Sequence, residues 1–398
     1  MKNRHTFFFL LSIFIALTAC TPKPESMQDV INRSMAVAAK HLVAMDQTLA
    51  AQEGKLPRSI NPQTGELITS NSRWWCSGFY PGSLWYLYEF NQDESLKTLA
   101  EKYTAIIEKE KYTTTTHDLG FMLYCSFGNG LRQTSQPAYE EVLVTGSESL
   151  CTRYHSTVGL IKSWDHNNDK WQFPVIIDNM MNLEMLMWTF KHTGDSAFYN
   201  ISVSHADKTM ENHYRPDYSC YHVVSYDTIT GMPHIKQTHQ GAADESIWAR
   251  GQAWGLYGYV MMYRETGHQR YLDMANQIAD LMISHPNLPP DKIPYWDYLA
   301  PEIPNEERDA SAAAIMASAL IELSGYVDQN RKEQYLSVAE TQLRTLASPE
   351  YLAEPGTNGN FILKHSVGHK PGKSEVDVPL TYADYYFLEA LLRFQKII

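Results

Sequence analysis

Two aspartates in this chain have neighbours that suit a carboxyl group for acid–base chemistry. Asp178 follows the apolar run Pro174–Ile177 and precedes Met180, so we expect its carboxyl group to be buried among large apolar side chains. Burial disfavours the charged form and keeps the proton on the acid at neutral pH, as a general acid requires. Asp118 lies where a polar run turns into an apolar one, in Thr115–Phe121. The alternative for both residues is a structural role as a helix N-cap, without any part in catalysis. The apolar setting makes Asp178 the better catalytic candidate of the two.

Tryptophan residues point to a carbohydrate ligand, because the apolar face of a sugar ring packs well on an indole ring. Trp85 and Trp188 lie on apolar helical stripes, and we expect them in the core. Trp75 and Trp254 instead lie among small and polar residues. Trp75 and Trp254 are therefore better candidates for contact with a sugar than the two core tryptophans.

Other chemistries lack their motifs in this sequence. The chain has no glycine-rich phosphate loop, no zinc-protease histidine pair and no nucleophile elbow. Among the 15 histidines, His222, His234 and His239 invite a metal site, but no pair at helical spacing with a nearby acid accompanies them. We predict no metal ion.

The elements that must position these residues are helices. Apolar residues recur at intervals of three and four positions, over Leu84–Phe90, Leu183–Phe190, Leu256–Tyr263 and Leu388–Leu392. A helix that ends in a polar turn and leads to an aromatic-led second helix also recurs, most clearly in Phe190–Tyr199 and Tyr263–Leu272. Gly194 and Gly267 in these turns fit the left-handed C-cap of a helix.

Repeated helical hairpins stack into a solenoid or close into a ring, and the connections favour the ring. The stretches Ser163–Pro174 and Tyr218–Ile247 are long and irregular, unlike solenoid loops, and they hold Trp, Asp, His and Gln side chains. Binding and catalytic residues concentrate in such loops on one side of a rigid scaffold. The sequence therefore predicts an all-α fold, a closed α/α barrel with its site at one mouth.

The N-terminus indicates export. Lys2 and Arg4 precede the apolar run Phe7–Ala16, and Leu17–Cys20 resembles a bacterial lipobox. We predict a signal peptide over residues 1–19, a lipid on Cys20, a tether over 20–28 and a single catalytic domain over 29–398. The expected location is the bacterial cell envelope, on the periplasmic or outer-membrane face. The alternative is an ordinary cleaved signal peptide in which Cys20 is incidental.

Charge and cysteine content limit the partners. Loss of Lys2 and Arg4 with the signal peptide changes the formal net charge from −12 to −14, which disfavours nucleic acid and anionic lipid. An anionic small substrate then needs local Arg, Lys or His residues in a cleft. Free thiols and one disulfide are both open for the four remaining cysteines, which are Cys76, Cys125, Cys151 and Cys220.

Five motifs occur in order over nearly all of the expected mature chain, and they are Trp75–Gly82, His117–Phe121, Ile177–Asn182, His239–Gly255 and Tyr382–Phe387. Together they resemble glycoside hydrolase family 88, the unsaturated glucuronyl hydrolases. The run Trp-Ala-Arg-Gly-Gln-Ala-Trp, which begins at Trp248, is the most specific of these motifs.

The resemblance implies an (α/α)6 barrel of helical hairpins with no metal or organic cofactor. It places the two essential aspartates on Asp118 and Asp178, with Asp178 as general acid and base. The residues implied to hold the sugar and its carboxylate are Trp75, His222, Gln240, Arg250 and Trp254, to which we add His117 beside Asp118. A family loop that helps to choose sulfated substrates corresponds to Ser366–Ser374.

The activity implied by the resemblance is removal of a 4,5-unsaturated uronic acid from the non-reducing end of a lyase-generated oligosaccharide, by hydration of its C4=C5 double bond. An unsaturated rhamnogalacturonyl hydrolase on the same barrel and a non-catalytic glycan-binding lipoprotein are the alternatives. Sugar epimerases also use helical barrels but would depend on paired histidines. The expected partners are unsaturated uronyl oligosaccharides, and the membrane only through the lipid anchor. The oligomeric state stays open.

Overall fold

The computed structural model describes residues 25–398. The expected signal peptide, the expected lipidation site Cys20 and the first part of the expected tether lie outside these residues. Helix α1 (Met27–Leu49) is the first described helix, and Ser26 caps it by accepting the backbone N–H of Asp29. None of the described helices combines the length and the apolar character needed to cross a membrane.

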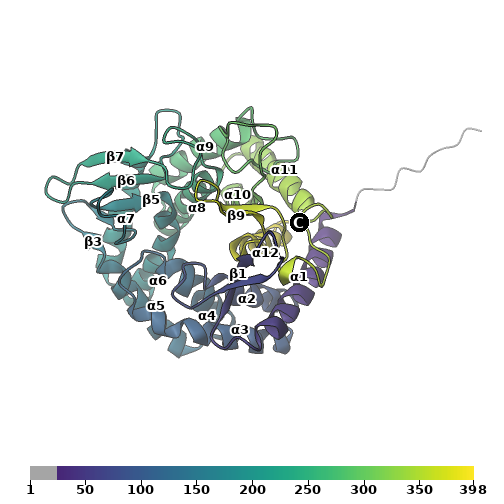
Figure 1. The fold of residues 1–398 in the computed structure, drawn as a ribbon. Helices are drawn as coiled ribbons and strands as arrows, with labels where there is room; N and C mark the ends of the chain where they lie inside the picture. Colours follow the sequence, from purple (N-terminus) through teal and green to yellow (C-terminus); the bar gives the residue numbers. More distant parts are fainter. Residues whose placement is uncertain (1–24) are drawn as a thin grey trace, which may run out of the picture.

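Within residues 25–398, two concentric rings of helices form an (α/α)6 barrel, and the fold prediction is confirmed (Figure 1). The inner ring contains α2 (Phe79–Asn91), η2 (Gly120–Gly128) continued by α4 (Asn129–Thr134), η3 (Ile177–Asn182) continued by α6 (Leu183–Thr193), α8 (Ala249–Thr266), α10 (Ala310–Leu323) and α12 (Thr381–Gln395). The outer ring contains α1, α3 (Glu94–Ile107), α5 (Pro137–Cys151), α7 (Ser196–His213), α9 (Gln269–Ser284) and α11 (Gln329–Leu346). A short 3₁₀ segment, η1 (Glu108–Tyr112), extends α3, and another, η4 (Asn358–Asn360), precedes the last hairpin.

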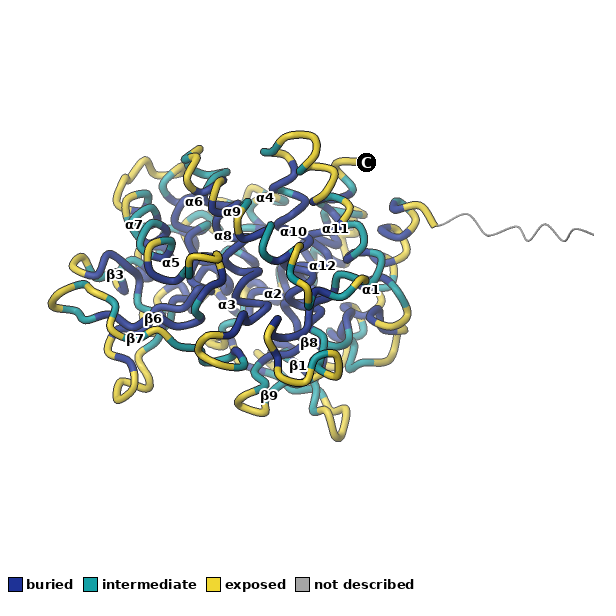
Figure 2. The backbone as a smooth tube through the Cα atoms, turned by 90° about the horizontal axis from the view of Figure 1, so that it is seen from above, coloured by how far each residue is buried: buried dark blue, intermediate teal, exposed yellow. Residues whose placement is uncertain are grey.

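The two rings differ in their sequences, which explains their positions. Inner helices are buried on all sides, as in Ala249–Met262 of α8 and Ala310–Ile321 of α10. A helix that is apolar all round must be buried on all sides. Outer helices bury one stripe, such as the stripe of α3 that contains Leu96, Ala100 and Tyr103. Figure 2 shows this gradient from a buried centre to an exposed rim.

Helix ends follow the expected capping chemistry. Asp93, Asp195 and Asp328 lie at N-caps and accept backbone N–H groups of the first turn. Gly194 and Gly267 end α6 and α8 in the left-handed conformation, with φ values of 77° and 67°. Both predicted glycine C-caps are therefore confirmed.

Short antiparallel strands gather at one end of the barrel (Figure 2). Three hairpins are formed by β1 (Leu56–Ile60) with β2 (Leu67–Ser70), β3 (Tyr154–His155) with β4 (Leu160–Ile161), and β8 (Ser366–His369) with β9 (Ser374–Val378). A three-stranded sheet has the order β5 (Pro174–Ile176), β6 (Val223–Tyr226) and β7 (Pro233–Gln237).

The stretch Tyr218–Ile247 is more ordered than the sequence interpretation suggested. The β-branched pair Val223-Val224 lies in β6 and pairs on both sides, with β5 and with β7. The strand is too short to give a periodic signal, so the sheet was not predicted. Cys76, Cys125, Cys151 and Cys220 are free thiols in the described part of the chain.

Candidate active site

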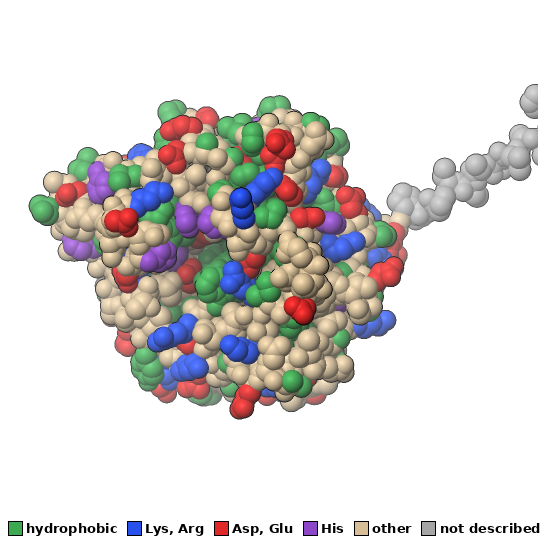
Figure 3. Space-filling view, in the orientation of Figure 1, with side chains coloured by type: hydrophobic (Ala, Val, Ile, Leu, Met, Phe, Trp, Pro, Cys, Tyr) green, Lys and Arg blue, Asp and Glu red, His purple; other side chains and the backbone are tan. Residues whose placement is uncertain are grey.

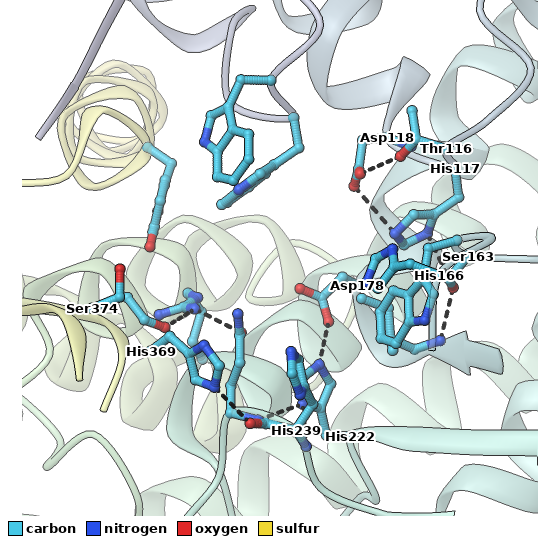
Figure 4. A pocket seen from close by; sticks show the side chains of 18 of the residues that line it. Thr116, His117, Asp118, Ser163, His166, Asp178, His222, His239, His369 and Ser374 are labelled. Atoms are coloured by element: carbon cyan, nitrogen blue, oxygen red, sulfur yellow. Dashed lines mark hydrogen bonds and ion pairs between the residues drawn. The ribbon is translucent and has the colours of Figure 1, made fainter. Parts of the chain in front are cut away.

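A cavity of about 480 Å³ opens at the end of the barrel where the strands gather. Its walls include seven of the eight predicted site residues, namely Trp75, His117, Asp118, Asp178, His222, Gln240 and Arg250. These residues come from distant parts of the chain, and each lies at or just before the start of an inner helical segment or in a loop at this mouth. Figure 4 shows the two aspartates facing the same space.

Asp178 lies in the first turn of η3, at the end of β5, and only 9% of the residue is exposed. Burial raises the pKa of its carboxyl group to about 7, the Arg250 guanidinium opposes that rise, and the Asp118 carboxylate adds to it. Oδ2 has no hydrogen-bond partner among the described residues. Asp178 therefore holds its proton near neutral pH, and its carboxyl group lines the cavity.

His222 lies beside the carboxyl group of Asp178. Its Nδ1 accepts the backbone N–H groups of His239 and Gln240, at 3.1 and 3.0 Å. An imidazole nitrogen that accepts hydrogen bonds carries no proton, so the proton of neutral His222 is on Nε2. Nε2 lies 3.7 Å from Oδ2 of Asp178. Burial keeps the pKa of His222 well below its usual range, and the residue can act only as a neutral donor here.

Asp118 lies across the cavity, two residues before Gly120, where the π-helix η2 begins after its N-cap Leu119. Its Oδ2 accepts a hydrogen bond from the Thr116 hydroxyl at 2.5 Å, and His117 Nε2 lies 3.2 Å from its Oδ1. Burial lowers the pKa of His117. Two polar side chains thus hold Asp118 in a fixed orientation toward the cavity.

The segments that carry the two aspartates, at the starts of η2 and η3, contact each other directly. Asn182, one turn after Asp178, accepts the backbone N–H of Phe121 through its Oδ1 at 2.9 Å. A Cβ at Gly120 would lie 2.6 Å from the Asn182 Cα, so only glycine permits this close approach. The relative position of the two carboxyl groups is therefore set by backbone contact.

Arg250 lies in the first turn of α8 and is almost completely buried. Its guanidinium donates to the carbonyl oxygens of Val367 and Gly368 on β8 and to Gln240 Oε1 at 3.0 Å. The buried Asp309, which caps α10, lies 3.6 Å away. Arg250 therefore joins α8, β8 and Gln240 and contributes a positive charge to the cavity.

Aromatic rings form one wall of the cavity. Trp75 contacts Tyr382 at a centroid distance of 4.8 Å and Phe121 at 5.5 Å, and it is partly exposed. Trp254, the eighth predicted residue, is fully buried and does not line the cavity, because its ring packs between Phe121 and Tyr386. Its indole N–H lowers the pKa of Asp178, against the larger effect of burial. Trp254 thus acts on Asp178 from the buried core and not from the cavity wall.

Sequence reasoning missed several residues of the cavity. Trp164, His166 and His369 line it without having been singled out as binding residues, although Trp164 lies in the irregular loop that the sequence analysis marked. Arg58 and Glu375 also line it, and no local pattern distinguishes them. Arg58 and Glu375 can be recognised as cavity residues only from the folded structure, because two hairpins from opposite ends of the chain meet at the cavity.

Not every acid in the matched motifs belongs to the cavity. Asp384 is buried in α12 and accepts the backbone N–H groups of Ile362 and Leu363 at 2.9 and 2.8 Å. Burial raises its pKa to about 8. Asp384 therefore anchors the segment before β8 to the inner ring. Within residues 25–398, no cluster of three or more His, Cys, Asp or Glu side chains is arranged to hold a metal ion.

The direction of the inner helices favours an anionic ligand. The inner helical segments begin at this mouth, as shown by Asp178 at the start of η3, Arg250 at the start of α8 and Tyr382 at the start of α12. Helix N-termini carry partial positive charge and attract anions. The site can therefore bind an anionic ligand despite the net charge of −12, and Figure 3 shows Lys, Arg and His side chains around this opening.

The barrel, the aromatic wall and a buried protonated acid beside a second carboxylate define a carbohydrate-processing enzyme. The family model for Glycosyl Hydrolase Family 88 matches residues 51–394. The chain belongs to this family of glycoside hydrolases.

Relatives and solved structures agree with this assignment. An unsaturated glucuronyl hydrolase of Formosa agariphila is 48% identical over 343 residues, which cover 86% of this chain and 85% of the relative. An unsaturated chondroitin disaccharide hydrolase of Streptococcus agalactiae is 32% identical, with 81% of each chain covered. The crystal structure of an unsaturated glucuronyl hydrolase specific for heparin matches with a TM-score of 0.90 and 47% identity, over 93% of this chain and 98% of that chain.

Proposed function

We propose that this protein hydrolyses unsaturated uronyl oligosaccharides derived from glycosaminoglycans, releasing the 4,5-unsaturated uronic acid from the non-reducing end. The observation that carries the proposal is the buried carboxyl group of Asp178, which lines the cavity and whose raised pKa keeps it protonated. Two relatives named above act on unsaturated glucuronides or chondroitin disaccharides, as their names say.

The reaction begins with proton transfer from Asp178 to C4 of the double bond, whose π electrons form the new C4–H bond. The positive charge that results is shared by C5 and the ring oxygen. Asp118 faces this region and stabilises the charge, and Arg250 offsets the carboxylate of the substrate. Water then forms a bond to C5 and gives a proton to Asp178, which regenerates the acid.

The hydrated product is a hemiketal at C5, and its decay releases the neighbouring sugar. The C5–ring oxygen bond breaks to give a ketone at C5, and the former ring oxygen becomes a hydroxyl on C1. C1 is then a hemiacetal, which opens to an aldehyde and the free hydroxyl of the leaving sugar. The glycosidic bond is thus broken without direct protonation of its oxygen, unlike the reaction with two carboxyl groups used by most glycosidases.

Replacement of the acid tests the assignment. Asp178→Asn should lower kcat by about 10²- to 10⁴-fold, the usual contribution of a positioned proton donor. The measurement is the loss of absorbance of the conjugated double bond, with circular dichroism to establish that the variant folds. Asp273→Asn, which removes an exposed carboxylate on the outer helix α9, is the matched control. Wild-type turnover by Asp178→Asn would remove Asp178 from the mechanism.

A panel of lyase digests distinguishes this activity from its alternatives. Chondroitin, hyaluronan, heparin and rhamnogalacturonan digests are assayed side by side. Activity only on the rhamnogalacturonan digest favours the pectin enzyme, and chromatographically unchanged substrates favour a glycan-binding protein. In deuterated water, the proposed route places deuterium at C4 of the released uronate product.

We further propose that the protein is anchored to the cell envelope by a lipid on Cys20. The support is the sequence Leu17-Thr18-Ala19-Cys20 after a charged and apolar leader. Cys20→Ala should move the protein from the membrane fraction to the soluble fraction in the native host or in a bacterium that processes lipoproteins. Cys76→Ala, at a buried thiol, should leave the protein in the membrane fraction. Retention of Cys20→Ala in the membrane would contradict the anchor.

A further inference from the structure

A groove of about 510 Å³ adjoins the catalytic cavity on the side of η1 and of the loop that follows β2. We call this space the side groove, and its walls come from the segments 71–73 and 109–115. Arg73 and Thr115 line both the side groove and the catalytic cavity, so the two spaces meet at these residues. Thr115 is three residues before Asp118, and Arg73 is two residues before Trp75. The side groove therefore begins close to the catalytic groups.

A buried carboxylate holds the two walls of the side groove together. Glu110 is 2% exposed, and it accepts the Ser72 hydroxyl at 2.5 Å through Oε1 and the Thr113 hydroxyl at 2.8 Å through Oε2. Arg153 donates to the carbonyl oxygen of Thr114 at 2.6 Å and fixes the backbone there. The walls are thus ordered before any ligand arrives, and a ligand that binds to them loses less free energy in ordering the protein.

The cations of the side groove have no acceptor in the described part of the chain. Two arginines of the catalytic cavity are already engaged, since Arg250 donates to backbone carbonyl groups and Arg58 pairs with Glu375. The third is Arg73, whose guanidinium has neither a hydrogen-bond acceptor nor an ion-pair partner within residues 25–398. The ammonium group of Lys109 also lacks both within this range. Both side chains are exposed, and two free cations on one groove favour an anionic ligand.

The remaining groups of the side groove suit a sugar ring. Tyr112 is 67% exposed, and its ring can pack on the apolar face of a sugar. Thr114 and Thr115 are also exposed, and their hydroxyl groups make no hydrogen bond within residues 25–398. A hydroxyl group can both donate to and accept from the hydroxyls of a sugar. An aromatic ring, free hydroxyls and free cations together match the chemistry of an acidic sugar.

We propose that the side groove is a distal subsite that binds an acidic sugar beyond the leaving sugar of the substrate. The proposal rests on the proposed function and deepens it. The unsaturated sugar lies beside Asp178 and the leaving sugar follows it, so the third sugar of a longer fragment extends toward the rim of the cavity. Uronic acids and amino sugars alternate in most glycosaminoglycans, and the third sugar then carries a carboxylate. The guanidinium of Arg73 can bind this carboxylate through two hydrogen bonds, and Lys109 adds a second positive charge.

The experiment compares the unsaturated disaccharide and the unsaturated tetrasaccharide of hyaluronan, neither of which carries a sulfate group. For each enzyme variant, the measured quantity is the ratio of kcat/KM for the tetrasaccharide to kcat/KM for the disaccharide, from the loss of double-bond absorbance. This ratio should exceed one for the wild-type protein. Arg73→Gln and Lys109→Gln should each lower it by about threefold, because an exposed ion pair is worth little, and the variant with both changes by about tenfold.

Lys332→Gln is the matched control. Lys332 is an exposed lysine on the outer helix α11, forms no ion pair within residues 25–398 and lines neither space. Its replacement removes the same charge and should leave the ratio unchanged. Sodium chloride raised from about 0.05 M to about 0.5 M should lower the wild-type ratio, because salt screens exposed charges, and should leave the ratio of the double variant unchanged.

Three results overturn the distal subsite. These are a wild-type ratio of one or less, a double variant whose ratio stays within about twofold of the wild-type value, and an equal loss in Lys332→Gln, which would indicate a general charge effect. Circular dichroism establishes that each variant folds. If the wild-type protein turns over neither oligosaccharide nor any other lyase digest, the proposed function itself fails, and the two failures are therefore distinct.

Discussion

At the scale of single residues, Asp178 pairs a functional advantage with a cost in stability. Its pKa is about 7 in the folded protein, whereas an exposed aspartate in the unfolded chain titrates near 3.9. Between these values the folded state binds more protons than the unfolded state, so this residue makes the free energy of unfolding fall as pH rises from about 4 to 7. The same proton is needed for catalysis.

The stability of Asp178→Asn relative to the wild-type protein should therefore rise by about 4 kcal/mol between pH 4 and pH 8, because the amide never ionises. Urea unfolding of both proteins at pH 4, 6 and 8 measures the difference. The other buried acids with raised pKa values, such as Asp384, are present in both proteins, so their contributions to the stability difference cancel. A stability difference that does not vary with pH would show that Asp178 is not protonated in the folded state. The kcat/KM of the wild-type enzyme should fall above about pH 7 for the same reason.

At the scale of elements, the sequence predicted what local patterns encode. The apolar run before Asp178 indicated a buried acid because β5 and η3 are both buried, and the periodic stripes identified the inner helices. Glycine C-caps were predictable because Gly194 and Gly267 follow polar turns. The resemblance supplied the remaining site residues, and seven of the eight predicted site residues meet in one cavity.

Contacts between distant elements could not be predicted in this way. The β1–β2 hairpin carries Arg58 from the start of the chain to Glu375 on β9, and neither strand is periodic enough to be recognised alone. Trp254 was expected against the sugar because small and polar residues surround it in sequence. Those neighbours are buried too, since Arg250–Trp254 lies in α8 at the centre of the barrel. The small and polar residues around Trp254 therefore indicated a position inside the barrel and not a position on its surface.

At the scale of the whole molecule, the two ends of the inner ring have different tasks. Helix starts surround the catalytic cavity, and helix ends surround a second polar cavity of about 320 Å³ at the opposite end. There Arg264 of α8 bonds Glu184 of α6 and Glu322 of α10, and Arg393 of α12 also contacts Glu322. Four of the inner segments are thus joined by charge far from the reacting carbons.

This network should support stability and not catalysis. Arg264→Met leaves Glu184 without an ion-pair partner and leaves Glu322 paired with Arg393 alone. We expect the free energy of unfolding to fall by about 2 kcal/mol, below the 3–5 kcal/mol typical of a fully buried pair, because the Arg264 side chain is 27% exposed. The kcat of the folded variant should stay close to the wild-type value, since the cavity at the opposite mouth keeps all its contacts. Urea unfolding at pH 7 and the absorbance assay measure the two quantities. Arg344→Met, which removes an exposed pair with Glu340 on the outer helix α11, should cost less than about 0.5 kcal/mol. A large loss of kcat in Arg264→Met with unchanged stability would mean instead that the two ends of the barrel are coupled.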